Sequence, residues 1–201
     1  PPGKALLWRA SLPERSLVAM SELRTPRLLL RPWRESDRAP LAAMTADPLT
    51  MRYFHVTRTR AQSDAWLDRT TAHFAAHGYG LWAVEAPGVA GLIGFVGLST
   101  IPERVPVHAP VELVWTLGAP FWGHGYAPEA ARAALADGFA RFDFPEVVGY
   151  TTTMNAPSRR GMRKLGMRFD PMASFDHPAI PAGSVLRRHV VYRMARGDCP
   201  R

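Results

Sequence analysis

The chain has 201 residues, 47% of them hydrophobic and 21% charged, so it can bury one substantial core and is expected to form one main domain. No apolar run reaches the roughly 18 residues that a membrane-spanning helix needs, and the single cysteine, Cys199, argues against a disulfide framework and favours a reducing, cytoplasmic location. A net charge of +8, from 25 basic and 17 acidic residues, favours an anionic partner, either nucleic acid or a phosphorylated cofactor.

The first residues of the chain show no clear hydrophobic period. We therefore predict that residues 1–21 form an N-terminal extension, with Met20 as a candidate native start. A signal peptide is the weaker alternative, because charged residues interrupt the stretch where it would be apolar. Residues 22–196 are expected to form the domain, and residues 197–201 a short tail.

Turn and capping signals delimit the elements of the first half. Arg27–Arg31 is predicted to be a strand that ends at Pro32, and Ser36–Thr45 a short helix. Thr59 and Gln62 have the spacing of a capping box, which predicts the start of a longer helix that ends before Gly78. The remaining elements are predicted as an antiparallel hairpin of residues 80–85 and 92–99, strands 111–117, 146–153 and 187–194, and helices from Pro128 and over 157–165.

The order strand, helix, strand after residue 111 predicts a right-handed crossover between two parallel strands in a mixed sheet. The helix between them carries a stripe of small and apolar residues, which allows close packing on a sheet. That stripe consists of Ala127, Ala130, Ala131, Ala134, Leu135, Gly138, Phe139 and Phe142.

The segment between the first of these strands and the helix has the features of an anion site. Gly123 and Gly125 allow a tight turn, and Pro128 suits a first helical turn. A helix N-terminus presents unpaired N–H groups and the positive end of its dipole, for which a phosphate or pyrophosphate is a suitable ligand. Taken alone, the same glycines also fit a simple turn.

Three segments in this order resemble the GCN5-related N-acetyltransferases (GNAT family), in particular the subgroup that acetylates the N-termini of ribosomal proteins and its small-molecule-modifying relatives. They are LRTPRLLLRPWRESD, ELVWTLGAPFWGHGYAPEA and NAPSRRGMRKLGM, and the resemblance covers residues 23–194. It implies a single α/β domain with a mixed, mostly antiparallel sheet, a splayed parallel strand pair and flanking helices.

The resemblance implies an acetyl-CoA site and no metal. The family pattern falls on Trp122, Gly125 and Ala127, and Trp122 departs from the glutamine or arginine of many relatives, so its side chain is not counted as a phosphate ligand. The pyrophosphate would be held by the backbone amides of Gly123, His124, Gly125, Tyr126 and Ala127. The pantetheine arm would pair with the strand backbone at Trp115 and Leu117, and Asn155 and Ser158 would contact the cofactor from the start of the following helix. Asn155 also fits a simple helix cap.

The chemistry needs a base for the amine, a donor for the oxyanion and a proton for the departing thiolate. Glu112 is the expected base, acting directly or through water, although a surface or salt-bridged strand residue is the alternative. A backbone N–H near Trp115–Leu117 is the expected oxyanion donor. Relatives place a tyrosine seven residues after the asparagine; here that position is Met162, so Ser158 takes the role of thiolate donor by default.

Several further residues carry weaker signals. His73 and His77 are spaced as a helical pair, but Phe74 stands where a zinc protease has glutamate, so no metal site is predicted. The cations Arg159, Arg160, Arg163, Lys164 and Arg168 suit a solvated face, and Arg159 or Arg160 could meet CoA phosphates. His55, Trp66, His108 and the predicted loop Phe175–Pro178 are candidates for the acceptor side.

The expected function is acetyl-CoA-dependent N-acetylation of a primary amine by direct attack in a ternary complex. Alternatives are a transferase with another acyl donor and a non-catalytic acyl-CoA-binding module. A nucleic-acid-binding protein is suggested by charge alone and is not favoured, because the cations are spread over several segments. The acceptor stays open between a protein N-terminus and a small amine, and the protein is expected to be a monomer or a homodimer.

Overall fold

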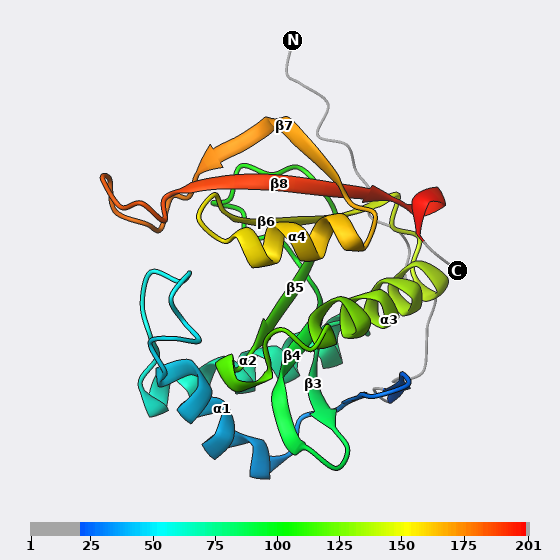
Figure 1. Cartoon of the computed structure of the whole chain (residues 1–201). Helices are drawn as coiled ribbons and strands as arrows, with labels where there is room; N and C mark the ends of the chain where they lie inside the picture. Colours follow the sequence, from blue (N-terminus) through cyan, green and yellow to red (C-terminus); the bar gives the residue numbers. More distant parts are fainter. Residues whose placement is uncertain (1–20, 200–201) are drawn as a thin grey trace.

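Eight strands form one sheet in the spatial order β1-β2-β3-β4-β5-β6-β8-β7. The computed structural model describes residues 21–199 (Figure 1). The strands are β1 Leu23–Arg24, β2 Leu29–Arg31, β3 Leu81–Ala86, β4 Ala90–Ser99, β5 Glu112–Leu117, β6 Glu146–Thr152, β7 Arg168–Asp176 and β8 Arg188–Ala195. Neighbours are antiparallel except for β5 and β6, so the sheet is mixed and mostly antiparallel, as the sequence predicts.

The parallel pair is held together at one point only. Strands β5 and β6 are in register at Glu112 and Val148, where the Val148 N–H donates to the Val111 carbonyl at 3.2 Å. On its other side, β5 pairs with β4 over six residues, from Glu112 to Leu117. The predicted splay is therefore present, and it begins immediately after Glu112.

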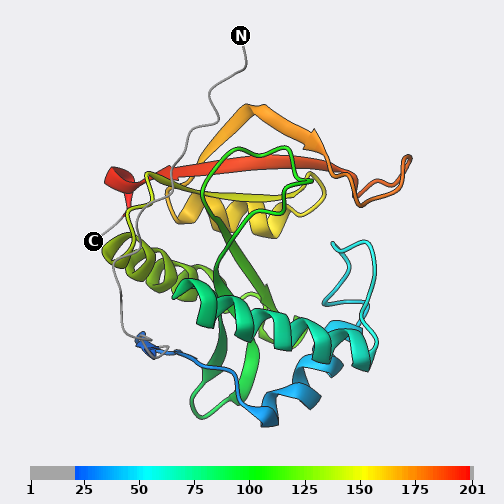
Figure 2. The ribbon, with the colours of Figure 1, turned by 180° about the vertical axis from the view of Figure 1, so that it is seen from behind.

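Helices cover both faces of the sheet. They are α1 Arg38–Ala46, α2 Arg60–His77, α3 Tyr126–Arg141 and α4 Ala156–Lys164. Figure 1 shows α3 and α4 on one face, and Figure 2 shows α2 crossing the other. The stripe of small residues brings α3 close to β4, since a Cβ on Gly138 would lie 2.3 Å from the Leu98 side chain.

The buried side chains form three clusters. The largest lies between the sheet and α3 and α4. On the other face, one cluster centres on Leu41, Leu67 and Phe95 under α1 and α2, and another on Val105, Val148, Phe175 and Val191 under the 100–110 loop. Glu112 lies on this second face, because it is directly opposite Ser99 in β4 and Val148 in β6.

The start of the first helix differs from the prediction. Glu35–Asp37 forms a 3₁₀ turn, and α1 begins at Arg38 rather than at Ser36. The cause is the Asp37 carboxylate, which is buried against Arg31 in a bidentate pair of 2.8 and 2.9 Å and accepts from the Arg34 backbone N–H at 2.7 Å.

The predicted loop at Phe175–Pro178 is wrong at its first two residues. Phe175 and Asp176 end strand β7, which sequence patterning missed. This strand contains Pro171 and a register shift between Asp170 and Phe175, features that edge strands tolerate and that obscure the alternation of a strand. Strand β1 was also missed, because two residues carry no periodic signal.

The predicted domain limits remain predictions. Residues 1–20 and 200–201 lie outside the described residues, so the structure does not test the N-terminal extension. At the other end, Cys199 packs against the largest core cluster. No helix within residues 21–199 is both long and apolar enough to cross a membrane.

Candidate active site

The turn before α3 has the geometry that anion binding requires. Gly123 and Gly125 have φ of 83° and 80°, in the left-handed region, and Gly125 is the N-cap of the 16-residue helix. No heavy atom lies within 4 Å of a Cβ built on Gly123. The first helical hydrogen bond runs from the Glu129 N–H to the Gly125 carbonyl, so the N–H groups of Tyr126 and Ala127 remain directed out of the helix end. The backbone geometry is compatible with the predicted amide cluster, whose contact with a cofactor stays a prediction.

This turn is fixed by residues far away in sequence. The Glu129 carboxylate accepts from the Thr25 hydroxyl at 2.6 Å and from the Arg27 backbone N–H and Nε at 3.0 and 2.7 Å. Arg27 Nη1 in turn donates to the His124 carbonyl at 2.9 Å. Burial raises the pKa of Glu129, but the hydrogen bonds from Thr25 and Arg27 outweigh it and hold that pKa below its usual value. The turn between β1 and β2, which carries Thr25 and Arg27, therefore braces the turn before α3, a role that its sequence alone does not reveal.

The side chains of the turn pack on one another. The rings of His124 and Tyr126 are stacked with centroids 5.4 Å apart, and the Arg27 guanidinium lies 4.9 Å from the Tyr126 centroid. The predicted role of His124 and Tyr126 belongs to their backbone amides, and the stacking of the two rings does not use those amides.

The open edge of β5 carries the groups predicted to meet the pantetheine arm. The Val111 carbonyl faces β6, so the backbone groups of Trp115 and Leu117, on the same side of the strand, face the splay. One acceptor there is already used, because the Trp122 indole N–H donates to the Leu117 carbonyl at 2.7 Å. Trp122 thus has a structural role that is consistent with its departure from the family pattern. The Trp115 indole extends to α4, where a Cβ on Gly161 would lie 3.3 Å from it.

Asn155 is the N-cap of α4. Its Oδ1 accepts from the Ser158 N–H at 3.2 Å, and its Nδ2 donates to the Thr151 hydroxyl at 3.1 Å. The capping role is confirmed, whereas a contact with the cofactor stays a prediction. The Ser158 hydroxyl makes no hydrogen bond within residues 21–199. Met162 is 1% exposed in the core and is not available to the site.

Glu112 is a half-buried carboxylate at the point where the two parallel strands separate. Burial raises its pKa to about 7, and a hydrogen bond from Tyr150 on β6 lowers that pKa in part. Burial and then the Glu112 charge raise the pKa of Tyr150, so the phenol stays protonated. Glu112 forms no ion pair with any described residue, so the salt-bridged alternative does not apply. Tyr150 was not singled out from the sequence, because its contact with Glu112 is made across the splay.

The histidine pair and Arg159, which carry weaker sequence signals, make contacts within the protein. His73 and His77 have ring centroids 4.4 Å apart, and His73 Nε2 lies 3.3 Å from the Thr100 hydroxyl. No group of three metal-ligating side chains occurs in the described part of the chain. Arg159 Nη1 donates to the Thr153 carbonyl at 3.1 Å, which holds it at the β6–α4 turn.

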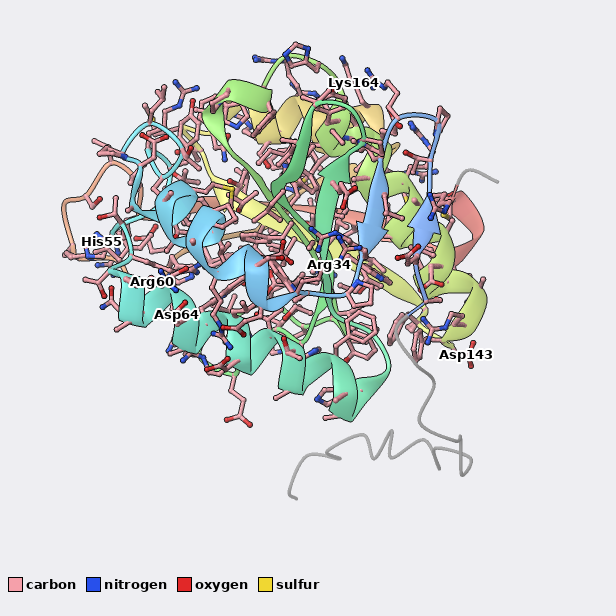
Figure 3. All side chains as sticks on the ribbon, turned by 90° about the horizontal axis from the view of Figure 1, so that it is seen from below. Arg34, His55, Arg60, Asp64, Asp143 and Lys164 are labelled. Atoms are coloured by element: carbon pink, nitrogen blue, oxygen red, sulfur yellow. The ribbon has the colours of Figure 1, made fainter. Side chains whose placement is uncertain are left out.

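The acceptor-side candidates come from different elements: Trp66 is on α2, Phe175 and Asp176 end β7, and His55, His108, His177 and Pro178 are on loops. The loop of residues 47–59, which carries His55, and the loop of residues 177–187 are on the same side of the sheet edge in Figures 1 and 2, and Figure 3 labels His55 on the former. His177 and His189 have ring centroids 5.0 Å apart, and His189 is 6.2 Å from Tyr150 by the same measure.

Comparison with known proteins decides the family. A family model described as an acetyltransferase (GNAT) domain matches residues 27–168, more than half of the chain. The chain belongs to this family. As a GNAT acetyltransferase it uses acetyl-CoA as the acetyl donor.

Individual relatives are more distant. The chain is 28% identical to the uncharacterized protein YkkB of Bacillus subtilis over 152 residues, 75% of this chain and 87% of the relative. It is 27% identical to the FsC-acetyl coenzyme A-N(2)-transacetylase of Aspergillus fumigatus over 161 residues, 76% of this chain and 67% of the relative. The solved structure of RimL, a ribosomal L7/L12 α-N-protein acetyltransferase in complex with coenzyme A, shares the fold with a TM-score of 0.71 at 13% identity, over 87% of this chain and 98% of that one.

Proposed function

We propose that this acetyltransferase transfers the acetyl group to a primary amine by direct attack within a ternary complex. The observation that carries the proposal is the position of Glu112, which is half-buried at the origin of the splay with a pKa of about 7. A carboxylate with such a pKa is ionised in part near neutral pH and is basic enough to accept a proton from an amine or from a bridging water.

In the proposed reaction, Glu112, the β5 backbone and Ser158 each have a defined role. Glu112 takes a proton from the ammonium group, the free amine attacks the thioester carbonyl, and a backbone N–H between Trp115 and Leu117 stabilises the oxyanion. As the C–S bond breaks, the nitrogen that is positively charged in the tetrahedral intermediate loses one proton to water. The thiolate of CoA takes a proton from the Ser158 hydroxyl, which regains one from water, or from water that Ser158 orders, and Glu112 releases its proton to solvent. The amide and the thiol are the products.

The cofactor site that we propose has three parts. The amides of Gly123 to Ala127 hold the pyrophosphate, the β5 edge pairs with the pantetheine arm, and the start of α4 at Asn155 and Ser158 lies beside the thioester. The open space at Gly123 and the single strand pair at Glu112 and Val148 support this arrangement. The Aspergillus relative is an N(2)-transacetylase and RimL is an α-N-protein acetyltransferase, which supports an amine acceptor here and a place beside the ribosomal-protein subgroup.

The test is an assay of CoA release against a panel of amines, with the acetylated product identified by mass. If attack is direct, double-reciprocal plots of the initial rate should give intersecting lines when both substrates are varied. Parallel lines would show an acetylated enzyme intermediate instead. Replacing Glu112→Gln keeps the shape and removes the base, so turnover should fall about 10²-fold or more while acetyl-CoA affinity is kept. Tight acetyl-CoA binding without release of CoA to any amine would favour the binding-module alternative.

A further inference from the structure

A hollow of about 190 Å³ lies on the same face of the sheet as Glu112. It is lined by Trp66, Arg69, Thr70 and His73 from α2, by Leu81 and by Ser99. Ser99 is directly opposite Glu112 in the β4–β5 ladder, and side chains so paired have Cβ atoms about 5 Å apart. The hollow therefore extends to the neighbour of the proposed base.

Two arginines lie at Trp66, the aromatic wall of this hollow: Arg69 lines the hollow, and Arg58 packs on the Trp66 ring. The Arg58 guanidinium carbon lies 4.7 Å from the centroid of the Trp66 ring, and Arg69 is on the next turn of α2. Burial, and then the charge of Arg69, lower the pKa of Arg58. The two cations are thus close enough to repel each other, and Arg58 is half-buried whereas Arg69 is exposed.

No carboxylate compensates these charges within residues 21–199. Neither arginine side chain forms an ion pair or a hydrogen bond with another described residue. The two acids of α2 are engaged elsewhere, since Asp64 bonds Arg60 at 2.7 Å and Asp68 bonds Arg38 at 2.8 Å. Stacking on Trp66 satisfies one face of the Arg58 guanidinium, but its N–H donors lie in the ring plane and still need acceptors.

Resting on the proposed function, we infer that the hollow beside Trp66 binds an anionic group, a carboxylate or phosphate, of the amine acceptor through Arg58 and Arg69. The amino group of the same molecule then lies at Glu112. Paired guanidinium forks match the oxygens of such groups, and Thr70, Ser99 and His73 supply further polar contacts. The acceptor is an amine with a negative charge a few bonds away, either a small molecule or a peptide whose first residues are acidic.

The experiment compares acceptors that differ in charge but have similar amines. The pairs are β-alanine with 3-amino-1-propanol, phosphoethanolamine with ethanolamine, and the peptide Asp-Ala-amide with Asn-Ala-amide. At least one anionic member should have the higher kcat/KM in the wild type, by about 10-fold to 100-fold for a hydrogen bond to a charged group. The pair in which the preference appears tells carboxylate from phosphate and small molecule from peptide. Equal rates within every pair would overturn the inference and leave the proposed function intact.

Variants locate the preference. Arg69→Gln, at an exposed position, and Arg58→Gln should each remove the preference for the anionic acceptor while the rate with the neutral acceptor changes little. Arg69→Lys should keep part of the preference that Arg69→Gln loses. Arg132→Gln removes an equal charge from the exposed side of α3 and should change neither acceptor. A preference that survives both glutamine variants would overturn the inference.

A binding measurement separates this inference from failure of the proposed function. Inorganic phosphate and acetate are titrated into the protein with CoA present, and tryptophan fluorescence is followed, since Trp66 lies against Arg58. A saturable change that Arg69→Gln lacks supports the anion site even if no amine is acetylated. If no amine is acetylated, the absence of a saturable response in the wild type would reject the anion site.

Discussion

At the scale of single residues, the environment of Glu112 decides when the site can act. This half-buried carboxyl, with a pKa of about 7, is protonated at low pH and becomes a base only as the pH rises through that value. The pH profile of kcat/KM should therefore rise through an apparent pKa near 7. The Glu112→Gln variant should lack this limb.

Tyr150 gives a sharper test of the same pair. Its hydrogen bond stabilises the ionised form of Glu112 and so lowers the pKa of that carboxyl. Replacing Tyr150→Phe removes the bond but keeps the ring, so the pKa of Glu112 should rise and the acidic limb should move to higher pH. The measurement is the pH profile of kcat/KM for both proteins. A limb that stays in place or moves downward would show that Glu112 is not the titrating base.

Ser158 is the hydroxyl that we assign to the thiolate. Since a proton given to sulfur is used mainly in the transition state, Ser158→Ala should lower kcat more than it raises the KM for acetyl-CoA. Helix α4 should persist, because Asn155 still caps it. An acyl donor with a more acidic thiol should recover part of the rate. Normal turnover of the variant on acetyl-CoA would leave solvent as the proton source.

At the scale of elements, the turn before α3 and its brace determine cofactor binding. Gly125→Val places a side chain at φ 80° beside the Arg27 guanidinium, 3.5 Å from the new Cβ, in the turn proposed to hold the pyrophosphate. Acetyl-CoA affinity measured by calorimetry should fall strongly. Gly88→Val is the matched control, because Gly88 has φ 78° and open space in the β3–β4 turn. It should share the backbone strain but keep the affinity; equal affinities for the two variants would contradict the site.

The elements also show what sequence reasoning can reach. The capping box of Thr59 and Gln62, the left-handed Gly78 and the Asn155 cap are local signals, and the structure confirms all three. Strand β7 was missed because its pairing with β8 is interrupted at an edge, where alternation is weak.

The site was predictable where it depends on backbone and not where it depends on long-range contacts. The turn of Gly123 and Gly125 can be predicted from residue type, because glycine readily adopts the left-handed backbone conformation found there. The contact between Arg27 and Glu129 joins positions 102 residues apart, and neither segment has a local sequence pattern that identifies the other. Tyr150 and Arg58 were likewise missed, because their meaning comes from Glu112 and Trp66, which only the folded chain brings to them.

At the scale of the whole molecule, the sheet consists of two halves, β1 to β5 and β6 to β8, that meet in register at a single residue pair. Figure 1 shows β5 running obliquely between them. If acetyl-CoA completes the seam as an added strand, it stabilises the folded state by mass action, so the Tm should rise with its concentration. A Tm that does not respond to saturating acetyl-CoA would contradict the proposed placement.

The single joining pair also has a consequence for amide hydrogen exchange. Amides at the centre of a sheet are normally the slowest in a protein to exchange with solvent deuterium, yet those of Trp115 and Leu117 face a gap where a partner strand would be. Without cofactor they should exchange far faster than Val114 and Thr116, whose amides face β4. Acetyl-CoA should slow the first pair and leave the second unchanged, so alternate residues along one strand would report whether the cofactor is bound.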